Sequence, residues 1–138
     1  MAHFAELNDN NEIVRTIVIS NDDILDDNGQ ESEEHGVALA TRFTGSPARW
    51  IQVSFNGTFR RQYPSYEGFV YNEQFDAIIE PSPFPSWSLD DNGYWQAPVP
   101  KPADEEGFVF SWNEETQTWD KIEIPQPIET PEVPVIGE

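Results

Sequence analysis

Proline is distributed in this chain so that no long central β-strand can pass through its second half. Most of the twelve prolines lie in three segments, "EPSPFPSW" (80–87), "APVPKPAD" (97–104) and "IPQPIETPEVPVIGE" (124–138). Proline has no backbone N–H to donate to a sheet, and it favours extended polyproline-like geometry. The chain is therefore expected to build its sheets from short pieces joined by extended, Pro-rich arms.

Short hairpins are predicted before and between these proline segments. Each has an aromatic-rich arm, a turn that opens with Asn or Asp followed by an acid, and a second apolar arm. This pattern occurs in residues 3–20, 69–79, 87–95 and 108–122. "RWIQVSFNGTFRRQY" (49–63) predicts a further hairpin around Asn56-Gly57, which is a strong turn signal. The predicted fold class is mainly β, made of small antiparallel hairpins.

One short α-helix is predicted at about residues 32–43. Ser32 is a suitable N-cap, and the two acids after it favour the positive end of the helix dipole. Gly36 is expected to weaken the helix, and Gly45 to end it. The preceding residues 21–34 contain seven acids and no base, which is typical of a polar loop. The predicted organisation is a compact β-rich domain, 1–122, followed by an extended acidic Pro-rich tail, 123–138.

The net charge limits the kinds of partner. The 138 residues include 26 acids and seven Lys or Arg, giving a formal charge of −19. This charge disfavours nucleic acid and anionic membranes, which both require clusters of basic residues. It suits a very soluble protein, or one that binds a basic partner surface. The opening "MAHFAELNDN" has no signal-peptide pattern, so synthesis in a cytoplasm without export is expected.

No catalytic, cofactor or metal site is predicted. The chain has no Cys and two distant His, which leaves little material for a nucleophilic triad or a thiolate zinc site. The acidic run 22–29 does not fit a calcium loop, because placing Gly29 at position 6 puts Ile24 at position 1 and His35 at position 12. A solvated acidic loop is the main interpretation, and a weak cation site between subunits is the alternative.

A local group of basic and aromatic side chains is the candidate contact surface in the body of the chain. Arg49, Arg60 and Arg61 lie near several aromatic residues, and either internal pairing with acids or a protein interface fits this pattern. The tail adds apolar residues suited to lying along a surface. The predicted interface residues are Trp50, Arg60, Arg61, Tyr63, Ile128, Val133, Val135 and Ile136.

"WNEETQTW" (112–119) frames a polar turn with two tryptophans. Asn113 can close the turn on the backbone, which places Trp112 opposite Trp119 across the two strands. The octapeptide resembles the C-terminal hairpin of the immunoglobulin-binding domain of protein G, a resemblance that implies local geometry only. Two interpretations follow: a hairpin core, or an exposed aromatic platform for sugar or a neighbouring protein.

Several segments, taken in order, resemble a small protein common in marine phages, especially cyanophages. They are "MAHFAEL", "SNDDILDDNGQESEEHG", "SFNGTFRRQY", "YNEQFDAIIEPSPFPSWSLDDNGYWQAPVPKP" and "SWNEETQTW". The resemblance covers residues 1 to about 120, and the extension 122–138 departs from it. It implies a virion-associated structural protein without catalytic residues.

The expected function is that of a non-enzymatic virion structural protein, which decorates or cements the capsid shell. Its expected partners are other virion proteins, such as the major capsid protein, or a second copy of itself. A tail, neck or fibre-attachment protein is one alternative. The other is a sugar-binding module that contacts host polysaccharide through Trp87, Trp95, Trp112 and Trp119.

Overall fold

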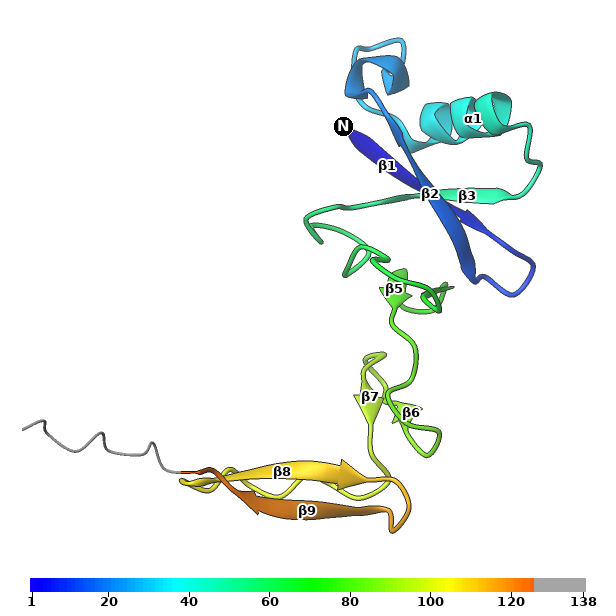
Figure 1. Ribbon diagram of the computed structural model, residues 1–138. Coiled ribbons are helices and arrows are strands. Elements are labelled where there is room, and N and C mark those ends of the chain that lie inside the picture. The colour runs from blue at the N-terminus through cyan, green and yellow to red at the C-terminus, as the bar shows by residue number, and fades with distance from the viewer. Residues whose placement is uncertain (126–138) are drawn as a thin grey trace, which may run out of the picture.

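The computed structural model describes residues 1–125. Within this part of the chain, nine strands form four small antiparallel sheets, and there is one α-helix. Figure 1 shows a sheet-and-helix unit at the N-terminus, from which the chain runs through two small hairpins to a longer C-terminal hairpin. The predicted mainly β class with one short helix is confirmed.

The N-terminal sheet has three strands in the order β2-β1-β3. These are β1 (Ala2–Leu7), β2 (Ile13–Ile19) and β3 (Arg49–Val53). β1 lies in the centre and is antiparallel to both neighbours, with a register shift against β2 at Glu6/Leu7. Because β1 is covered on both faces, its run of small and large apolar residues is almost wholly buried.

Helix α1 (Glu33–Thr44) covers one face of this sheet. It begins where Ser32 Oγ accepts the His35 backbone N–H at 3.3 Å, and it ends at Gly45, whose φ of 69° is left-handed. Helix position and caps agree with the prediction to within one residue. Gly36 contributes to packing as well, because it lies directly against the ring of Phe4.

Residues 21–34 are more ordered than the predicted polar loop. Asn21–Ile24 form the 3-10 helix η1, and Ile24 is fully buried beside Phe4, Ala40 and Trp50. A single apolar side chain therefore anchors this acidic segment to the core, which the count of acids did not predict.

The other face of the sheet is covered by β4 (Val70–Asn72) and β5 (Ala77–Ile79). This second part of the core is formed by Ala5, Leu7, Ile51, Val53, Phe69, Tyr71 and Ile78. The Ile13 N–H donates to Phe69 O at 3.1 Å, and the Tyr71 N–H donates to Asn11 O at 2.9 Å. The hairpin predicted at 69–79 is thus confirmed and forms part of the N-terminal unit.

The hairpin predicted at 49–63 is wrong. Strand β3 pairs with β1, and residues 54–63 form turns and bends. The free side of β3 is occupied by side chains: the Gln52 N–H donates to Glu33 Oε2 at 2.8 Å, and Gln52 O accepts Arg60 Nη1 at 2.7 Å. Arg60 and Arg61 have positive φ angles, 51° and 71°, which interrupt an extended strand.

The last two hairpins are β6 (Ser88–Leu89) with β7 (Trp95–Gln96), and β8 (Phe108–Asn113) with β9 (Thr118–Glu123). Trp112 faces Trp119 across β8 and β9, as predicted. In the shorter hairpin Trp95 faces Leu89, and Trp87 lies outside the paired strands. Trp87 is therefore free to pack elsewhere, although the sequence pattern predicted it as a frame of this hairpin.

One five-residue turn occurs three times among residues 1–125. Asn8, Asp26 and Asp90 each accept, through Oδ1, the backbone N–H groups two and four residues later, at 2.9–3.0 Å. The fourth residue of each turn has a positive φ, which Gly29 and Gly93 adopt without strain. The acidic run 22–29 thus includes a turn-forming residue, Asp26, whose carboxylate accepts hydrogen bonds from two later backbone N–H groups of the turn.

Candidate functional site

An aromatic cluster centred on Trp87 holds the C-terminal hairpin to the chain before it. The Trp87 ring lies 6.0 Å from Trp112 and from Trp119, and 5.6 Å from Phe84, measured between ring centroids. Trp112 and Trp119 are 5.2 Å apart with their planes at 66°. Angled aromatic contacts of this kind add roughly 0.5–1.5 kcal/mol each beyond the area they bury.

Two indole N–H groups bind the proline segments to the last two hairpins. Trp95 Nε1 donates to Glu80 O at 2.9 Å, and Trp119 Nε1 donates to Val99 O at 2.8 Å. Both acceptors lie in proline-rich connections, whose carbonyl groups take no part in a sheet. The tryptophans therefore fix the arms as well as the hairpins.

Glu114 connects the C-terminal turn to the residue before Trp87. Its carboxylate accepts Trp112 Nε1 at 2.7 Å, Ser86 Oγ at 2.7 Å and the Ser86 backbone N–H at 3.0 Å. The hydrogen bond from Trp112, followed by those from Ser86, lowers the pKa of Glu114 below its ordinary value. One ionised side chain thus joins segments 28 residues apart.

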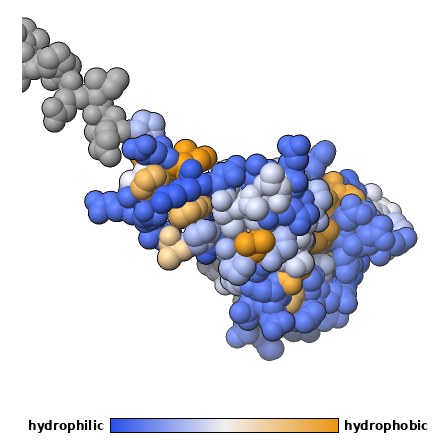
Figure 2. All heavy atoms as spheres, turned by 90° about the horizontal axis from the view of Figure 1, so that it is seen from below, coloured by the Kyte–Doolittle hydropathy of each residue, from blue (hydrophilic) through white to orange (hydrophobic). Residues whose placement is uncertain are grey.

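An open groove of about 540 Å³ lies beside the cluster. A second hollow of about 210 Å³ adjoins it, and Trp87 lines both. We call the first hollow the aromatic groove; it is lined by Tyr66, Glu80, Pro81, Ser82, Pro83, Trp87, Tyr94 and Trp95. The size falls within the range of ordinary ligand sites. The face shown in Figure 2 is mostly hydrophilic, with apolar side chains in separate patches.

Trp87 also carries a buried hydrogen-bond donor that lacks an acceptor. Its Nε1 has no partner among the described residues. Leaving a buried donor unsatisfied costs roughly 1–3 kcal/mol. Within the described part of the chain, the Trp87 indole N–H therefore lacks a hydrogen bond.

Two cations lie at the rim of these hollows. Arg61 lies 4.3 Å from the Tyr94 ring centroid and donates to Gly93 O at 2.5 Å and to Asn92 O at 2.7 Å. Lys101 Nζ lies 5.9 Å from the Trp119 ring. Within residues 1–125, four of the seven Lys and Arg side chains form ion pairs with carboxylates, whereas Arg42 on helix α1, Arg61 and Lys101 form none. A positive rim in so acidic a chain favours an acidic ligand.

The predicted interface residue Trp50 is in the core. It is 3% exposed and packs with Phe4 and Ile24 beneath helix α1. Its assignment as a contact residue is corrected: strand β3 buries alternate side chains under the helix, so the ring cannot reach a partner.

Arg60 takes part in an internal network. Its side chain is 16% exposed and binds Glu33, Asp76 and the Gln52 carbonyl. Burial acts to lower the pKa of Arg60, but hydrogen bonds and attraction to the two acids outweigh it and raise the pKa. The pKa of Asp76 is lowered, first by the hydrogen bond from Tyr71 and second by the one from Arg60. The pKa of Tyr71 is raised, first by burial and second by its hydrogen bond to Asp76. This geometry corresponds to the internal-pairing alternative.

The other predicted interface residues are divided between regions. Arg61 reaches the rim of the aromatic groove. Tyr63 is half-buried against the N-terminal core, with its hydroxyl 2.9 Å from Thr16 Oγ1. The tail residues lie outside the described part of the chain; they are Ile128, Val133, Val135 and Ile136.

The sequence reasoning named Trp87 and Trp95 but missed Tyr66 and Tyr94 as companions. Tyr66 precedes the 69–79 hairpin and Tyr94 lies in the 87–95 turn, so neither belongs to a shared local pattern. Tertiary packing brings them together, and the only sequence signal was aromatic residues on both sides of "EPSPFPSW".

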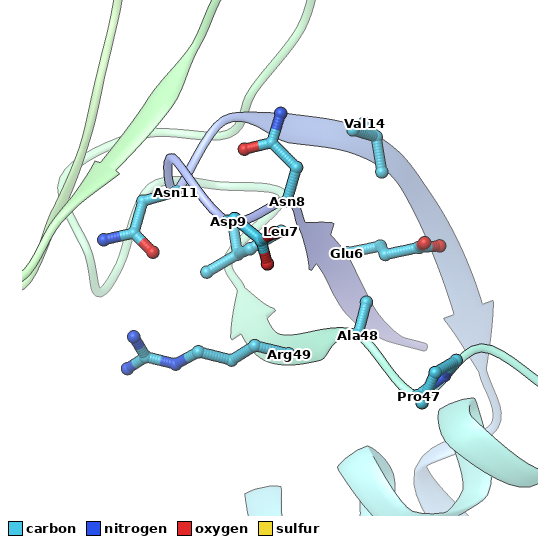
Figure 3. Close-up of a pocket in the computed structure, with 9 residues that line it drawn as sticks. All are labelled: Glu6, Leu7, Asn8, Asp9, Asn11, Val14, Pro47, Ala48 and Arg49. Atoms are coloured by element: carbon cyan, nitrogen blue, oxygen red, sulfur yellow. The ribbon is translucent and has the colours of Figure 1, made fainter.

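A separate hollow of about 480 Å³ lies beneath the β1–β2 turn (Figure 3). Its charged side chains are already engaged: Glu6 accepts Arg15 Nε at 2.5 Å and Ser46 Oγ at 3.0 Å, and Arg49 pairs with Glu73. In Figure 3 the Glu6 carboxylate and the Arg49 guanidinium point to opposite sides of the hollow. The aromatic groove is the stronger candidate because its aromatic rings can supply binding energy.

Across residues 1–125 there is no group of three His, Cys, Asp or Glu side chains that could hold a metal ion. The same residues contain no helix that is long and apolar enough to cross a membrane. No family model, curated protein or solved structure matches the chain.

Proposed function

We propose that this chain is a non-enzymatic structural component of a phage particle that decorates or cements the head shell. The supporting observation is the succession of small, separate sheets along the chain, from the N-terminal sheet to the Trp hairpin (Figure 1). The resemblance of residues 1 to about 120 to small virion proteins of marine phages supports the same assignment.

The two ends of the chain are held by separate sets of contacts. The N-terminal sheet has its core on both faces, and the last hairpin is held by the Trp87 cluster and by Glu114. A chain of such units spreads its contacts over a larger area than a single globule of the same length. That suits a small protein lying across larger shell subunits.

The charge supports a basic partner surface. With a formal charge of −19, free copies repel one another, while a basic patch on a shell subunit attracts them. The proposed partners are the major capsid protein and other virion proteins. Assembly in the host cytoplasm followed by residence in the virion is part of the proposal.

Quantitative mass spectrometry of purified phage particles tests this function. Head decoration predicts hundreds of copies per particle. Copy numbers in small multiples of six or twelve would instead support the tail, neck or fibre-attachment alternative. Absence of the chain from purified particles contradicts both.

The sugar-binding alternative is less well supported by the ring geometry. Trp87 lies at 81° to Trp112 and at 59° to Trp119, and Trp112 is buried, so these rings do not form a flat row. A glycan array separates the two ideas: binding that is lost in Tyr94→Ala would favour the sugar module, and no binding would remove it.

A further inference from the structure

We infer that the outer edge of strand β2 binds an extended, basic segment of a partner protein, which adds to the N-terminal sheet as a further strand. This inference does not depend on the proposed virion function. It rests on the direction of the backbone groups along β2, on the exposed side chains beside them, and on the acids near the two ends of the strand.

The backbone of β2 has unpaired hydrogen-bonding groups at its outer edge. Gln52 in β3 directs its N–H and C=O away from β1, so Phe4, which lies opposite it in β1, directs its own groups toward β2. Phe4 lies opposite Ile17, whose groups therefore point inward. Thr16 and Val18, on either side of Ile17, point outward. No hydrogen bond joins their backbone groups to the rest of residues 1–125.

The two edges of the sheet differ in their protection. Natural sheets cover an exposed edge or place charged side chains on it, because an uncovered edge can pair with another chain. The β3 edge is occupied by Glu33 and Arg60. On β2 the first residue, Ile13, is covered, since its N–H donates to Phe69 O. Beyond that residue, β2 is the edge that is open to an added strand.

Exposed apolar side chains and a hollow accompany this edge. Val14 and Val18 are 54% and 50% exposed, in a strand rich in the β-branched residues that favour sheet pairing. An open hollow of about 220 Å³, lined by residues 13–16 and 64–67, leaves space for side chains of an added strand. The recognition mode that fits is β-strand addition, in which backbone hydrogen bonds give affinity and neighbouring side chains give selectivity.

The charges around β2 define the composition of the partner segment. Residues 13–20 contain no acid, and their one base, Arg15, is already paired with a carboxylate. Exposed acids lie near both ends of the strand, and none of them forms an ion pair within residues 1–125. They are Glu12 and Glu67 near its start, and Asp22 and Asp23 after its end. A segment with apolar residues in its middle and Lys or Arg at both ends therefore complements this edge.

The same acids disfavour a second copy of the chain. Two β2 strands related by a two-fold axis pair antiparallel, so the start of one lies beside the end of the other. Pairing centred on Ile17 places Glu12 of one copy opposite Asp22 of the other, and symmetry repeats this contact. Like charges directly opposite across two strands are destabilising, and each copy carries a formal charge of −19. A basic partner is therefore favoured over self-pairing.

A basic model strand tests the inference on the full-length chain. The probe is the peptide KKVTVTVKK, and the readout is hydrogen exchange of backbone amides followed by NMR. With the peptide at about ten times its Kd, exchange of the Thr16 and Val18 amides should slow about tenfold. The Gln52 amide, which is already bonded at the opposite edge, should not change. Unchanged exchange at Thr16 and Val18 with millimolar peptide overturns the inference.

Three matched peptides separate backbone pairing from charge. EEVTVTVEE should not bind, and binding equal to that of KKVTVTVKK overturns the choice of a basic partner. KKVTVTVKK with an N-methyl group on every residue should not bind, because it lacks the donors of both edges, and its binding overturns strand addition. The peptide methylated on every second residue keeps one intact edge and should bind. Its failure to bind overturns pairing through a single edge.

Two variants of the chain complete the design. Val18→Lys places a like charge beside the basic peptide and should weaken its binding about tenfold or more, whereas undiminished binding overturns the assignment to this edge. Val109→Lys is the matched control, because Val109 on β8 is 48% exposed, and it should retain binding. Native protection of the Gln52 amide verifies that each variant is folded. Protection of Thr16 and Val18 that rises with the concentration of the chain alone would show self-pairing and contradict the basic partner.

Discussion

Gly36 in helix α1 lies so close to the ring of Phe4 in strand β1 that a β-carbon on Gly36 would stand 1.9 Å from Phe4 Cζ. The helix and the sheet meet at this contact, and the ring of Phe4 is fully buried between them. The absence of a side chain at residue 36 therefore sets how closely the two elements approach.

Gly36→Ala is expected to destabilise the protein. At an exposed helical position this change stabilises by about 1 kcal/mol, but overpacking a well-filled core costs roughly 1–3 kcal/mol. Urea unfolding followed by circular dichroism measures the difference. Ala38→Gly is the matched control at an exposed position of the same helix, where a loss of about 1 kcal/mol is expected from propensity alone. An unchanged or raised stability in Gly36→Ala would show that the helix can move away from Phe4.

Arg60→Ala is expected to lower the stability of the N-terminal unit by about 2–3 kcal/mol, since it removes hydrogen bonds to two charged groups and to a strand carbonyl. Chemical denaturation measures the loss. Arg49→Ala removes an exposed ion pair with Glu73 and should cost at most about 1 kcal/mol. Equal losses in the two variants would contradict a special role for Arg60 at the edge of strand β3.

Trp112 and Trp119 are expected to be energetically coupled by roughly 0.5–1.5 kcal/mol, as angled aromatic pairs are. A double-mutant cycle with Trp112→Leu and Trp119→Leu tests this, with hydrogen exchange of β8 amides as the measure of local stability. A parallel cycle between Trp112 and Trp50, which lie in different cores, should be additive within about 0.5 kcal/mol. Additivity in the first cycle would mean that the two rings do not stabilise each other.

The attachment of the last hairpin is expected to weaken in acid. The pKa of Glu114 is lowered in the folded chain. The stabilisation that its carboxylate gives to the docked hairpin is therefore complete above the ordinary pKa, 4.5, and is lost as the pH falls through the lower folded value. The protection of the Trp112 indole N–H, measured by NMR as the observed exchange rate relative to the intrinsic rate at each pH, should fall over this range.

Glu114→Gln is the matched test of that assignment. It should speed indole exchange at neutral pH and remove part of the acid dependence, while Glu115→Gln, an exposed neighbour in the same turn, should change neither. If the acid dependence persists unchanged in Glu114→Gln, other acids control the docking of the hairpin.

Local signals predicted much of the fold. The helix is set by Ser32 and Gly45, and the hairpins at 69–79 and 108–122 by their turn residues, all of which act within a few positions of the chain. The false hairpin at 49–63 shows where such reasoning stops. Its second arm is displaced because Glu33 and Arg60, 27 residues apart, occupy the edge of β3.

The candidate site was only partly predictable for the same reason. Trp87 and Trp95 stand out by type, but Tyr66, Tyr94 and Arg61 join them through packing of separate hairpins. Conversely, Trp50 was predicted as a contact residue because it lies near a basic cluster in the sequence. The alternation of side chains along strand β3 instead places its ring in the hydrophobic core. Residue type indicates which side chains can bind, and tertiary structure decides which are accessible.

Cryo-electron microscopy of purified phage particles tests the central proposal most directly. We predict density for this chain in many symmetry-related copies on the outer surface of the head shell, with its N-terminal sheet and Trp hairpin contacting shell subunits. Density confined to the tail or neck, or particles that lack the chain, would contradict the assignment as a head decoration protein.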